Sequence, residues 1–282
     1  MVTSKSDSRL SSESFAYQPV GVFDSGVGGL TVVKELIRQV PRENVIYVGD
    51  TAHVPYGTKS AVKVTELSLA ITRFLVKQHI KLLVVACNTA SALALEALQK
   101  KYPLLKIVGV ITPGAGEAVR HTHNLRVGVI GTAGTINSGA YKKHINRLNK
   151  AIKVYSYPCP LFVPLAEEGW GNTEVAYLTA EEYLKPVKSK DVDVLVLGCT
   201  HYPLLKPTLA KVMGAKVKLV DSASATAAAV KTILTVKGLL APGKHKGWQR
   251  FYVTDDPGKF NLLGSRFLKR IIRSTKLVDI GQ

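Results

Sequence analysis

Two cysteines occupy matching positions in two parts of the chain. Cys87 follows the apolar run Leu82–Ala86 and precedes Asn-Thr, and Cys199 follows Val194–Leu197 and a glycine and precedes Thr-His. Such runs are typical of buried parallel strands, and a long stretch of helical character follows each cysteine. The pattern predicts two thiols at strand ends near helix starts, where open α/β sheets bind ligands. Two opposed thiols carry protons to and from opposite sides of a carbon centre, as its inversion requires.

The neighbours of these cysteines predict reactive thiols. A helix start lowers the pKa of a thiol from about 8.5, so both thiolates are expected to be accessible near neutral pH. His201 is a candidate to tune Cys199, and Asp24, at an adjacent strand end, is a candidate to tune Cys87. A buried cysteine is otherwise a small apolar core residue, which is our interpretation of Cys159.

Short apolar runs alternate with amphipathic stretches along the chain. The runs of strand type lie at residues 20–23, 45–48, 82–86, 107–111, 127–130, 153–157, 194–197 and 216–220. Stretches with helical periodicity lie between them, for example at 30–39, 61–78 and 174–183. This alternation predicts an α/β fold with parallel-strand sheets flanked by helices.

A faint internal repeat relates two parts of the sequence. The segment that begins at Val20 resembles the segment that begins at Val127, and Gly131 is the counterpart of Asp24. Each part later offers a strand that ends in a cysteine, after a similar length of chain. The repeat predicts two similar α/β halves that face each other, with both thiols and the active site in one cleft.

The glycine-rich loop Asp24–Leu30 follows the first expected strand and opens a helix. Glycines let the backbone approach an anion at a helix start. A dinucleotide fingerprint would need glycine where Thr31 stands, and no Gly-Lys-Ser/Thr ends a glycine-rich loop, so a phosphate site is not expected. A small carboxylate ligand suits the loop, and a plain turn capped by Asp24 is an equally good interpretation.

Two further loops offer hydroxyl groups. Asp50–Gly57 ends in Pro-Tyr-Gly, which is either a rigid ligand loop that presents Tyr56 or a surface turn with a packed Tyr56. Gly131–Thr135 would supply Thr132 to a ligand from the second half.

Two neighbouring acids stand out in a basic protein. Glu167 and Glu168 precede a glycine. One of them is expected to face the cleft and hold a substrate ammonium, unless both belong to a solvated helix end.

The composition is that of a globular and strongly basic protein. Its 282 residues include 38 Lys and Arg against 20 Asp and Glu, for a formal net charge of +18. The basic residues lack the interleaved aromatics of single-strand binders, so a solvated basic surface is the preferred interpretation. Three cysteines without CxxC, HExxH or zinc-finger spacing argue against a disulfide framework and a metal site.

The N-terminal region and the apolar stretches bear on localisation. Residues 1–17 are rich in serine and charge, which predicts a disordered polar tail instead of a signal peptide. The longest charge-poor stretch, 82–95, is too short to span a bilayer. We therefore expect a soluble, cytoplasmic protein that does not bind membranes.

Six segments occur in order along the chain: Val22–Leu30, Pro55–Gly57, Ala86–Ala90, Gly131–Thr135, Glu167–Gly169 and Gly198–Leu205. Together they resemble the glutamate racemases of the cofactor-independent aspartate/glutamate racemase superfamily. The resemblance runs from about Val20 to Ser222 and, more weakly, from Phe251 to the last helix. It implies two α/β domains around a cleft: a discontinuous first domain of residues 18–111 and 222–282, and a second of residues 112–221.

The resemblance also implies an activity and its residues. It implies an enzyme that interconverts L- and D-glutamate without a cofactor and supplies D-glutamate for peptidoglycan. Cys87 and Cys199 would be proton donor and acceptor, with Asp24 and His201 beside them in the catalytic set. The implied substrate contacts are Asp24, Ser25, Tyr56, Gly57, Asn88, Thr89, Thr132, Glu167, Thr200 and His201. Related aspartate racemases typically carry glutamate where His201 stands, which favours glutamate as substrate.

Other interpretations stay open. One is an aspartate or other amino-acid racemase of the same superfamily. Another is a basic regulatory protein on a racemase-like scaffold that associates with nucleic acid or gyrase. A homodimer is also left open.

Overall fold

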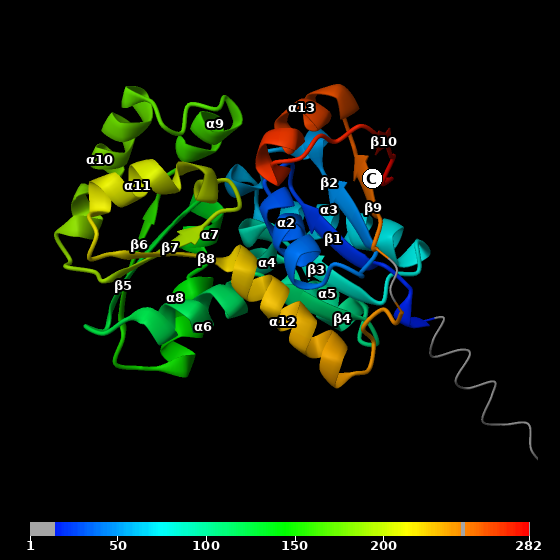
Figure 1. Ribbon diagram of the computed structural model, residues 1–282. Helices are drawn as coiled ribbons and strands as arrows, with labels where there is room; N and C mark the ends of the chain where they lie inside the picture. The colour runs from blue at the N-terminus through cyan, green and yellow to red at the C-terminus, as the bar shows by residue number, and fades with distance from the viewer. Residues whose placement is uncertain (1–14, 244–245, 282) are drawn as a thin grey trace, which may run out of the picture.

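The computed structural model describes residues 15–243 and 246–281. Most of the predicted polar tail, residues 1–14, lies outside the described residues. Of the remaining tail residues, 15–17, which the structure describes, Ala16 is buried. The chain forms two halves that lie side by side, each built around its own sheet (Figure 1).

The first half contains a six-stranded sheet in the order β10-β9-β2-β1-β3-β4, and all its pairings are parallel. Its strands are β1 (Val20–Asp24), β2 (Val45–Gly49), β3 (Leu82–Val85), β4 (Lys106–Gly109), β9 (Gln249–Val253) and β10 (Thr275–Leu277). The second half contains a parallel four-stranded sheet in the order β6-β5-β7-β8. Its strands are β5 (Arg126–Gly131), β6 (Lys153–Pro158), β7 (Val194–Gly198) and β8 (Lys218–Asp221).

Helices flank both sheets (Figure 1). Those that follow strands of the first sheet are α2 (Leu30–Gln39), α3 (Ala61–Lys77), α4 (Asn88–Leu93), α5 (Leu95–Lys101), α6 (Ile111–His121) and α13 (Pro257–Leu268). Those that follow strands of the second are α7 (Ala133–Asn137), α8 (Ala140–Leu148), α9 (Phe162–Glu167), α10 (Glu174–Lys188), α11 (Lys206–Met213) and α12 (Ser222–Val236). The described residues also form the short 3₁₀ turns η1 (Thr51–His53), η2 (Tyr56–Thr58) and η3 (Tyr202–Leu205). The α/β fold with parallel sheets is therefore confirmed.

The expected repeat of plan is confirmed by the strand orders. The series β2-β1-β3-β4 in the first sheet corresponds to β6-β5-β7-β8 in the second. Consequently β3 and β7, which precede the two cysteines, hold the same place in each half. The strands β9 and β10 extend the first sheet beyond this shared plan.

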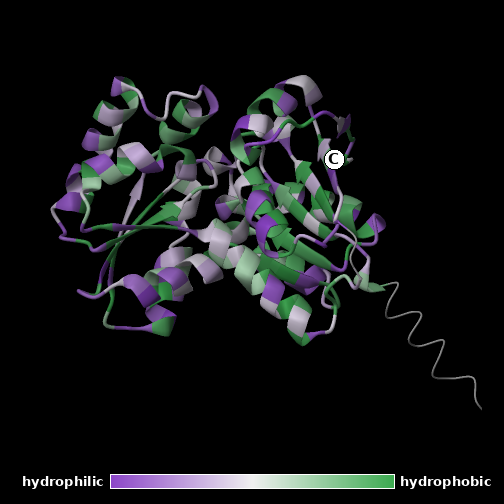
Figure 2. Cartoon of the chain, viewed as in Figure 1, coloured by the Kyte–Doolittle hydropathy of each residue, from purple (hydrophilic) through white to green (hydrophobic). Residues whose placement is uncertain are grey.

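Burial on both faces explains the continuous apolar runs. Every residue of β1, β2, β3 and β7 is buried, which is typical of parallel sheets with helices on both sides. Figure 2 shows the central strands as predominantly hydrophobic and the helices as mixed. The expected strand 107–111 ends earlier than predicted, because Val110 adopts a helical backbone conformation and α6 begins at Ile111. None of the helices in the described part of the chain is long and apolar enough to cross a membrane.

Helix α12 lies where the two halves meet. Helix α12 packs against both α2 and α6, and Figure 1 shows it along the lower junction of the halves. The proposed boundaries of the two domains stay a prediction.

A buried ion pair stabilises the first half. Lys81 Nζ lies 2.5 Å from Glu43 Oε2, with both side chains almost fully buried, and it also donates to the carbonyls of Ala16 and Leu239. Glu43 Oε1 accepts a hydrogen bond from Ala241 N at 2.8 Å. One ion pair thus joins three separate segments.

Replacing Lys81 by Met is expected to lower the free energy of unfolding by about 3–5 kcal/mol, because it leaves the Glu43 carboxylate buried without its cation. Urea denaturation measures the change. Lys185→Met is the control: its pair with Glu182 is at a similar distance but exposed, so the expected change is less than about 1 kcal/mol. Equal effects of the two substitutions would contradict the prediction.

Candidate active site

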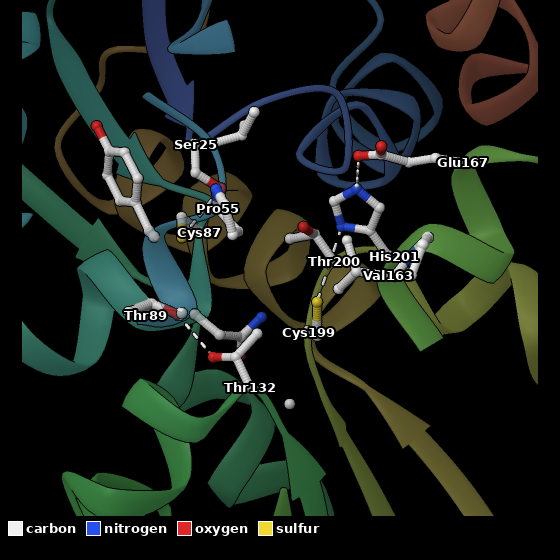
Figure 3. Close-up of a pocket in the computed structure, with 16 residues that line it drawn as sticks. Ser25, Pro55, Cys87, Thr89, Thr132, Val163, Glu167, Cys199, Thr200 and His201 are labelled. Carbon is white, nitrogen blue, oxygen red and sulfur yellow. Dashed lines mark hydrogen bonds and ion pairs between the residues drawn. The ribbon is translucent and has the colours of Figure 1, made fainter. Parts of the chain in front are cut away.

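A pocket of about 200 Å³ lies between the carboxyl-terminal ends of the two sheets. Figure 3 shows Cys87 and Cys199 on opposite sides of it, carried by different halves. Every predicted site residue except Asp24 lines this pocket. They are Ser25, Tyr56, Gly57, Cys87, Asn88, Thr89, Thr132, Glu167, Cys199, Thr200 and His201. The structure therefore brings together residues that lie far apart in the sequence.

Cys87 is a buried thiol at the start of α4. Its Sγ accepts a hydrogen bond from Ala90 N at 3.5 Å and donates to Ser25 Oγ at 3.7 Å. Burial, assisted by the negative charge of Asp24, raises the pKa of Cys87 to about 12. The expected lowering of this pKa by the helix start is therefore wrong, because burial outweighs the single N–H contact. The predicted long helix is also short, since α4 ends at Leu93.

Cys199 has a different environment, with a histidine beside it. Its Sγ lies 3.7 Å from His201 Nδ1, and His201 Nε2 lies 3.1 Å from Glu167 Oε1. Burial alone would lower the pKa of His201, but the contacts with Cys199 and Glu167 outweigh it and raise this pKa to about 10. The bond from His201 in turn lowers the pKa of Glu167. His201 is therefore an imidazolium held between the sulfur of Cys199 and the carboxylate of Glu167.

This environment does not come from an α-helix that starts at the cysteine. The chain after Cys199 forms the 3₁₀ turn η3, and the α-helix α11 begins only at Lys206. The expected helix start at Cys199 is wrong, and His201 supplies the positive charge that the helix was expected to provide.

Asp24 lies behind the pocket instead of lining it. Its side chain is fully buried, accepts hydrogen bonds from Gly26 N at 3.3 Å and Thr200 Oγ1 at 3.4 Å, and also bonds Gly29 N. Burial raises the pKa of Asp24. The N–H groups of the glycine-rich loop are thus bonded by the protein's own carboxylate, in agreement with the capped-turn interpretation. Substrate contact by Asp24 stays a prediction.

Gly28 lets the two catalytic loops approach each other. A Cβ atom at this position would lie 2.3 Å from Thr200 Oγ1 and 2.6 Å from His201 Nδ1. The close approach seen here is to protein side chains. Gly28 thus has a packing role that the sequence did not reveal.

Gly28→Ala is expected to reduce kcat about a hundredfold, because the added methyl displaces His201, and misplacement by about 1 Å costs that much. Steady-state kinetics measures the loss, and thermal unfolding verifies that the protein is folded. Gly116→Ala is the control, since a Cβ there meets no atom within 4 Å. A Gly28→Ala enzyme with normal kcat would contradict this role.

One wall of the pocket consists of hydroxyl and amide groups. Thr89 Oγ1 lies 2.9 Å from Thr132 Oγ1 and 3.1 Å from Thr135 Oγ1, which joins the two halves. Asn88 Oδ1 accepts a hydrogen bond from Tyr141 at 2.7 Å. Among the described residues, the buried Asn88 Nδ2 has no hydrogen-bond partner. This amide therefore retains a donor for a ligand.

Tyr56 is both packed and part of the pocket lining. It is almost fully buried, and its hydroxyl donates to Asp50 Oδ2 at 2.6 Å. His53 Nδ1 and Thr254 Oγ1 hold the other oxygen of Asp50, each at 2.7 Å. The two interpretations of this loop are therefore compatible, because a packed ring also forms the pocket wall.

The two acids of the second half have different positions. Glu167 lines the pocket and is bonded to His201, whereas Glu168 is exposed. The capture of a substrate ammonium by Glu167 stays a prediction. The sequence did not single out the apolar lining residues Val54 and Val163, because an apolar side chain in a short helix or loop carries no sign of its function.

The pH dependence of activity is expected to follow His201. Because its pKa is raised to about 10, the imidazolium persists through neutral pH and loses its proton as the pH rises through about 10. Turnover that needs this cation should therefore be retained to about pH 9 and fall above it. Measurement of kcat between pH 6 and 11 tests this. A fall centred near 6.5, the ordinary value for histidine, would contradict it.

Comparisons with known proteins agree with this geometry. Residues 20–230 match the family model described as Asp/Glu/Hydantoin racemase. The chain is 56% identical to a glutamate racemase of Geobacter metallireducens over 94% of this chain and 96% of that protein. It is 48% identical to a glutamate racemase of Syntrophus aciditrophicus, over 93% and 97% of the two chains.

Solved structures give the same result. A glutamate racemase of Francisella tularensis in complex with D-glutamate superposes with a TM-score of 0.88 at 40% identity, over 94% of this chain and 98% of that one. The family model covers most of the chain, and the relatives cover nearly all of it. The chain therefore belongs to the Asp/Glu/Hydantoin racemase family.

Proposed function

We propose that the protein interconverts L- and D-glutamate without a cofactor, through Cys87 and Cys199, and supplies D-glutamate for peptidoglycan synthesis. One observation carries the proposal: two thiols from different halves line one small pocket, in different electrostatic environments. Glutamate as substrate is supported by the relatives, of which one structure holds D-glutamate and another, from Escherichia coli, holds L-glutamate.

In this account the two thiols have different roles, because their environments differ. Cys87, with a pKa of about 12, is a neutral thiol and can donate a proton. Cys199 lies beside the His201 imidazolium, which stabilises a thiolate that can accept one. The Cys199 thiolate takes the α-proton from one face of glutamate, and the Cys87 thiol gives its proton to the other face. The opposite enantiomer is converted by the reverse transfers, which start from the form left by the first turnover, with Cys87 as thiolate and Cys199 as thiol. Exchange of the two sulfur protons with solvent interconverts the two forms.

The carbanion formed between these transfers needs stabilisation of its negative charge. In this account Asn88 Nδ2, a buried donor with no hydrogen-bond partner in the described part of the chain, donates to the α-carboxylate. The hydroxyls of Thr89 and Thr132 line the same pocket, and in this account one of them turns its O–H from the other threonine to the substrate. The hydroxyl of Thr200 already donates to Asp24. Fixed donors aimed at developing charge in a site closed to water are the largest contribution in many enzymes.

The proposed organisation and location follow the same evidence. Strands β1–β4, β9 and β10 lie within the proposed first domain of residues 18–111 and 222–282, and β5–β8 lie within 112–221. This division places one thiol on each domain. We place the protein in the cytoplasm, since a reducing compartment suits three unpaired cysteines.

Racemisation assays with four separate substrates test the proposal. Circular dichroism should decay to zero with L-glutamate and with D-glutamate, at equal final composition, without added cofactor. L- and D-aspartate should react at least about a hundredfold more slowly. Faster turnover of aspartate would support the alternative racemase, and no turnover of any substrate would contradict the proposal.

A further inference from the structure

Helix α13 belongs to the first half but reaches the catalytic residues of the second. Its apolar side chains Phe260 and Phe267 belong to the core beneath the first sheet. Gly264 lies close to Leu30, where a Cβ would be 2.8 Å from that side chain. The helix is therefore seated firmly against α2. Figure 1 shows it on the side of the first half that faces α9.

Arg266 on this helix binds the end of α9. Its Nη1 donates to the backbone carbonyl of Glu167, the last residue of α9, at 3.2 Å. A cation at a helix C-terminus satisfies a terminal carbonyl and interacts favourably with the helix dipole. Gly169, two residues after the end of α9, has φ +78° and no side chain. A Cβ there would lie 3.3 Å from Arg266 Nη1, so the glycine leaves room for the guanidinium. The contact joins the two halves of the molecule.

The next residue of α13 contacts the other member of the pair. The ring of Phe267 packs edge to face on His201, with centroids 5.3 Å apart and an interplanar angle of 83°. Arg266 and Phe267, two consecutive residues of α13, thus contact Glu167 and His201 respectively. Their mutual bond of 3.1 Å is what connects α9 to Cys199.

We propose that Arg266 is a positioning residue, which holds the end of α9 so that Glu167 stays bonded to His201 and keeps the imidazolium beside Cys199. This inference rests on the proposed function. Arg266 touches neither thiol, and its effect is transmitted through the α9 terminus. The first half thereby positions the histidine that lies beside the base carried by the second half.

Several charged groups surround the pair whose titration the proposal invokes. Cys199 and Glu167 contact His201, and Asp24 acts on it from the first half. Lys259, on α13, favours the charged form of Glu167. Asp255 and Asp256 line a neighbouring pocket together with Glu167 and Lys259. These groups are unchanged when only Arg266 is altered, and loss of the Arg266 charge by itself would favour the protonated His201. A fall in kcat that moves to lower pH therefore reports the position of Glu167.

Arg266→Met tests the proposal in the full-length protein. It keeps the aliphatic stem and removes the guanidinium, so kcat for glutamate is expected to fall three- to tenfold, as the loss of one hydrogen bond of about 1 kcal/mol predicts. The alkaline fall in kcat should move to lower pH by about half a unit to one unit, with KM little changed. Arg266→Lys, which keeps a cation, should recover part of both effects.

Arg270→Met is the matched control. Arg270 follows in the same segment and donates to Gln249 Oε1 at 2.8 Å, within the first half. It should show wild-type kcat and pH profile. An Arg266→Met enzyme with wild-type kcat and profile would overturn the inference, as would an unshifted profile with only a lower melting temperature. An inactive wild-type enzyme would instead contradict the proposed function.

Discussion

Cys87→Ser and Cys199→Ser are each expected to reduce kcat/KM for racemisation at least about a thousandfold in both directions. A serine hydroxyl is far less acidic than a thiol, so it neither removes the α-proton nor returns one at a useful rate, and such proton transfers contribute about 10²–10⁴-fold each. Circular dichroism with L- and D-glutamate measures the loss. The two losses should not add in the double variant, because the thiols act as one unit.

Cys159→Ser is the control for these substitutions. Cys159 is also buried, but it lies in the core of the second half and its thiol donates only weakly, to Tyr157 O at 3.8 Å. The substitution places a hydroxyl in an apolar core, so stability should decrease while kcat stays near that of the wild type. A Cys87→Ser or Cys199→Ser enzyme with near wild-type turnover would contradict the two-thiol mechanism.

Asn88→Asp is expected to have the second largest effect, a loss of about 10²–10³-fold in kcat/KM for glutamate. The change removes the Nδ2 donor, which has no protein partner among the described residues, and places a carboxylate oxygen opposite the substrate carboxylate. Removal of one preorganised donor costs about this much in other enzymes, and like-charge repulsion adds to it. Steady-state kinetics and calorimetric binding of D-glutamate measure the two contributions.

Asn137→Asp makes the same chemical change at an exposed position at the end of α7. It alters the net charge equally, so it separates the local effect from the field of a strongly basic protein. We expect its kcat/KM within about twofold of wild type, as for surface charges screened by salt. If Asn88→Asp behaved like Asn137→Asp, the assignment of Asn88 as a carboxylate ligand would be wrong.

The fold was largely predictable from local patterns. Buried parallel strands read as continuous apolar runs, and the cysteines after β3 and β7 fall at equivalent places in two sheets of the same strand order. Helix α2 matches the predicted range 30–39. The edge strand β10 (Thr275–Leu277) was not predicted, because it is short, largely exposed and polar in part, so its pairing with β9 depends on tertiary contact.

The sequence predicted most of the residues that line the site, but it did not predict how their surroundings shift their pKa values. Motif residues such as Ser25, Asn88 and Thr200 all line the pocket. The pKa of Cys87 could not be predicted, because it depends on burial by distant segments and on the charge of Asp24. The contact of Arg266 with α9 was equally invisible, since it joins residues about 100 positions apart that share no motif.

Solvent exchange at the α-carbon tests the central claim most directly. The wild-type enzyme, incubated with L-glutamate in deuterium oxide without added cofactor, should form D-glutamate that carries deuterium at Cα, because the Cys87 proton comes from solvent. Proton NMR should lose the α-proton signal as the circular dichroism decays. Inversion with retention of the original α-proton, or no exchange with either enantiomer, would contradict the two-thiol account.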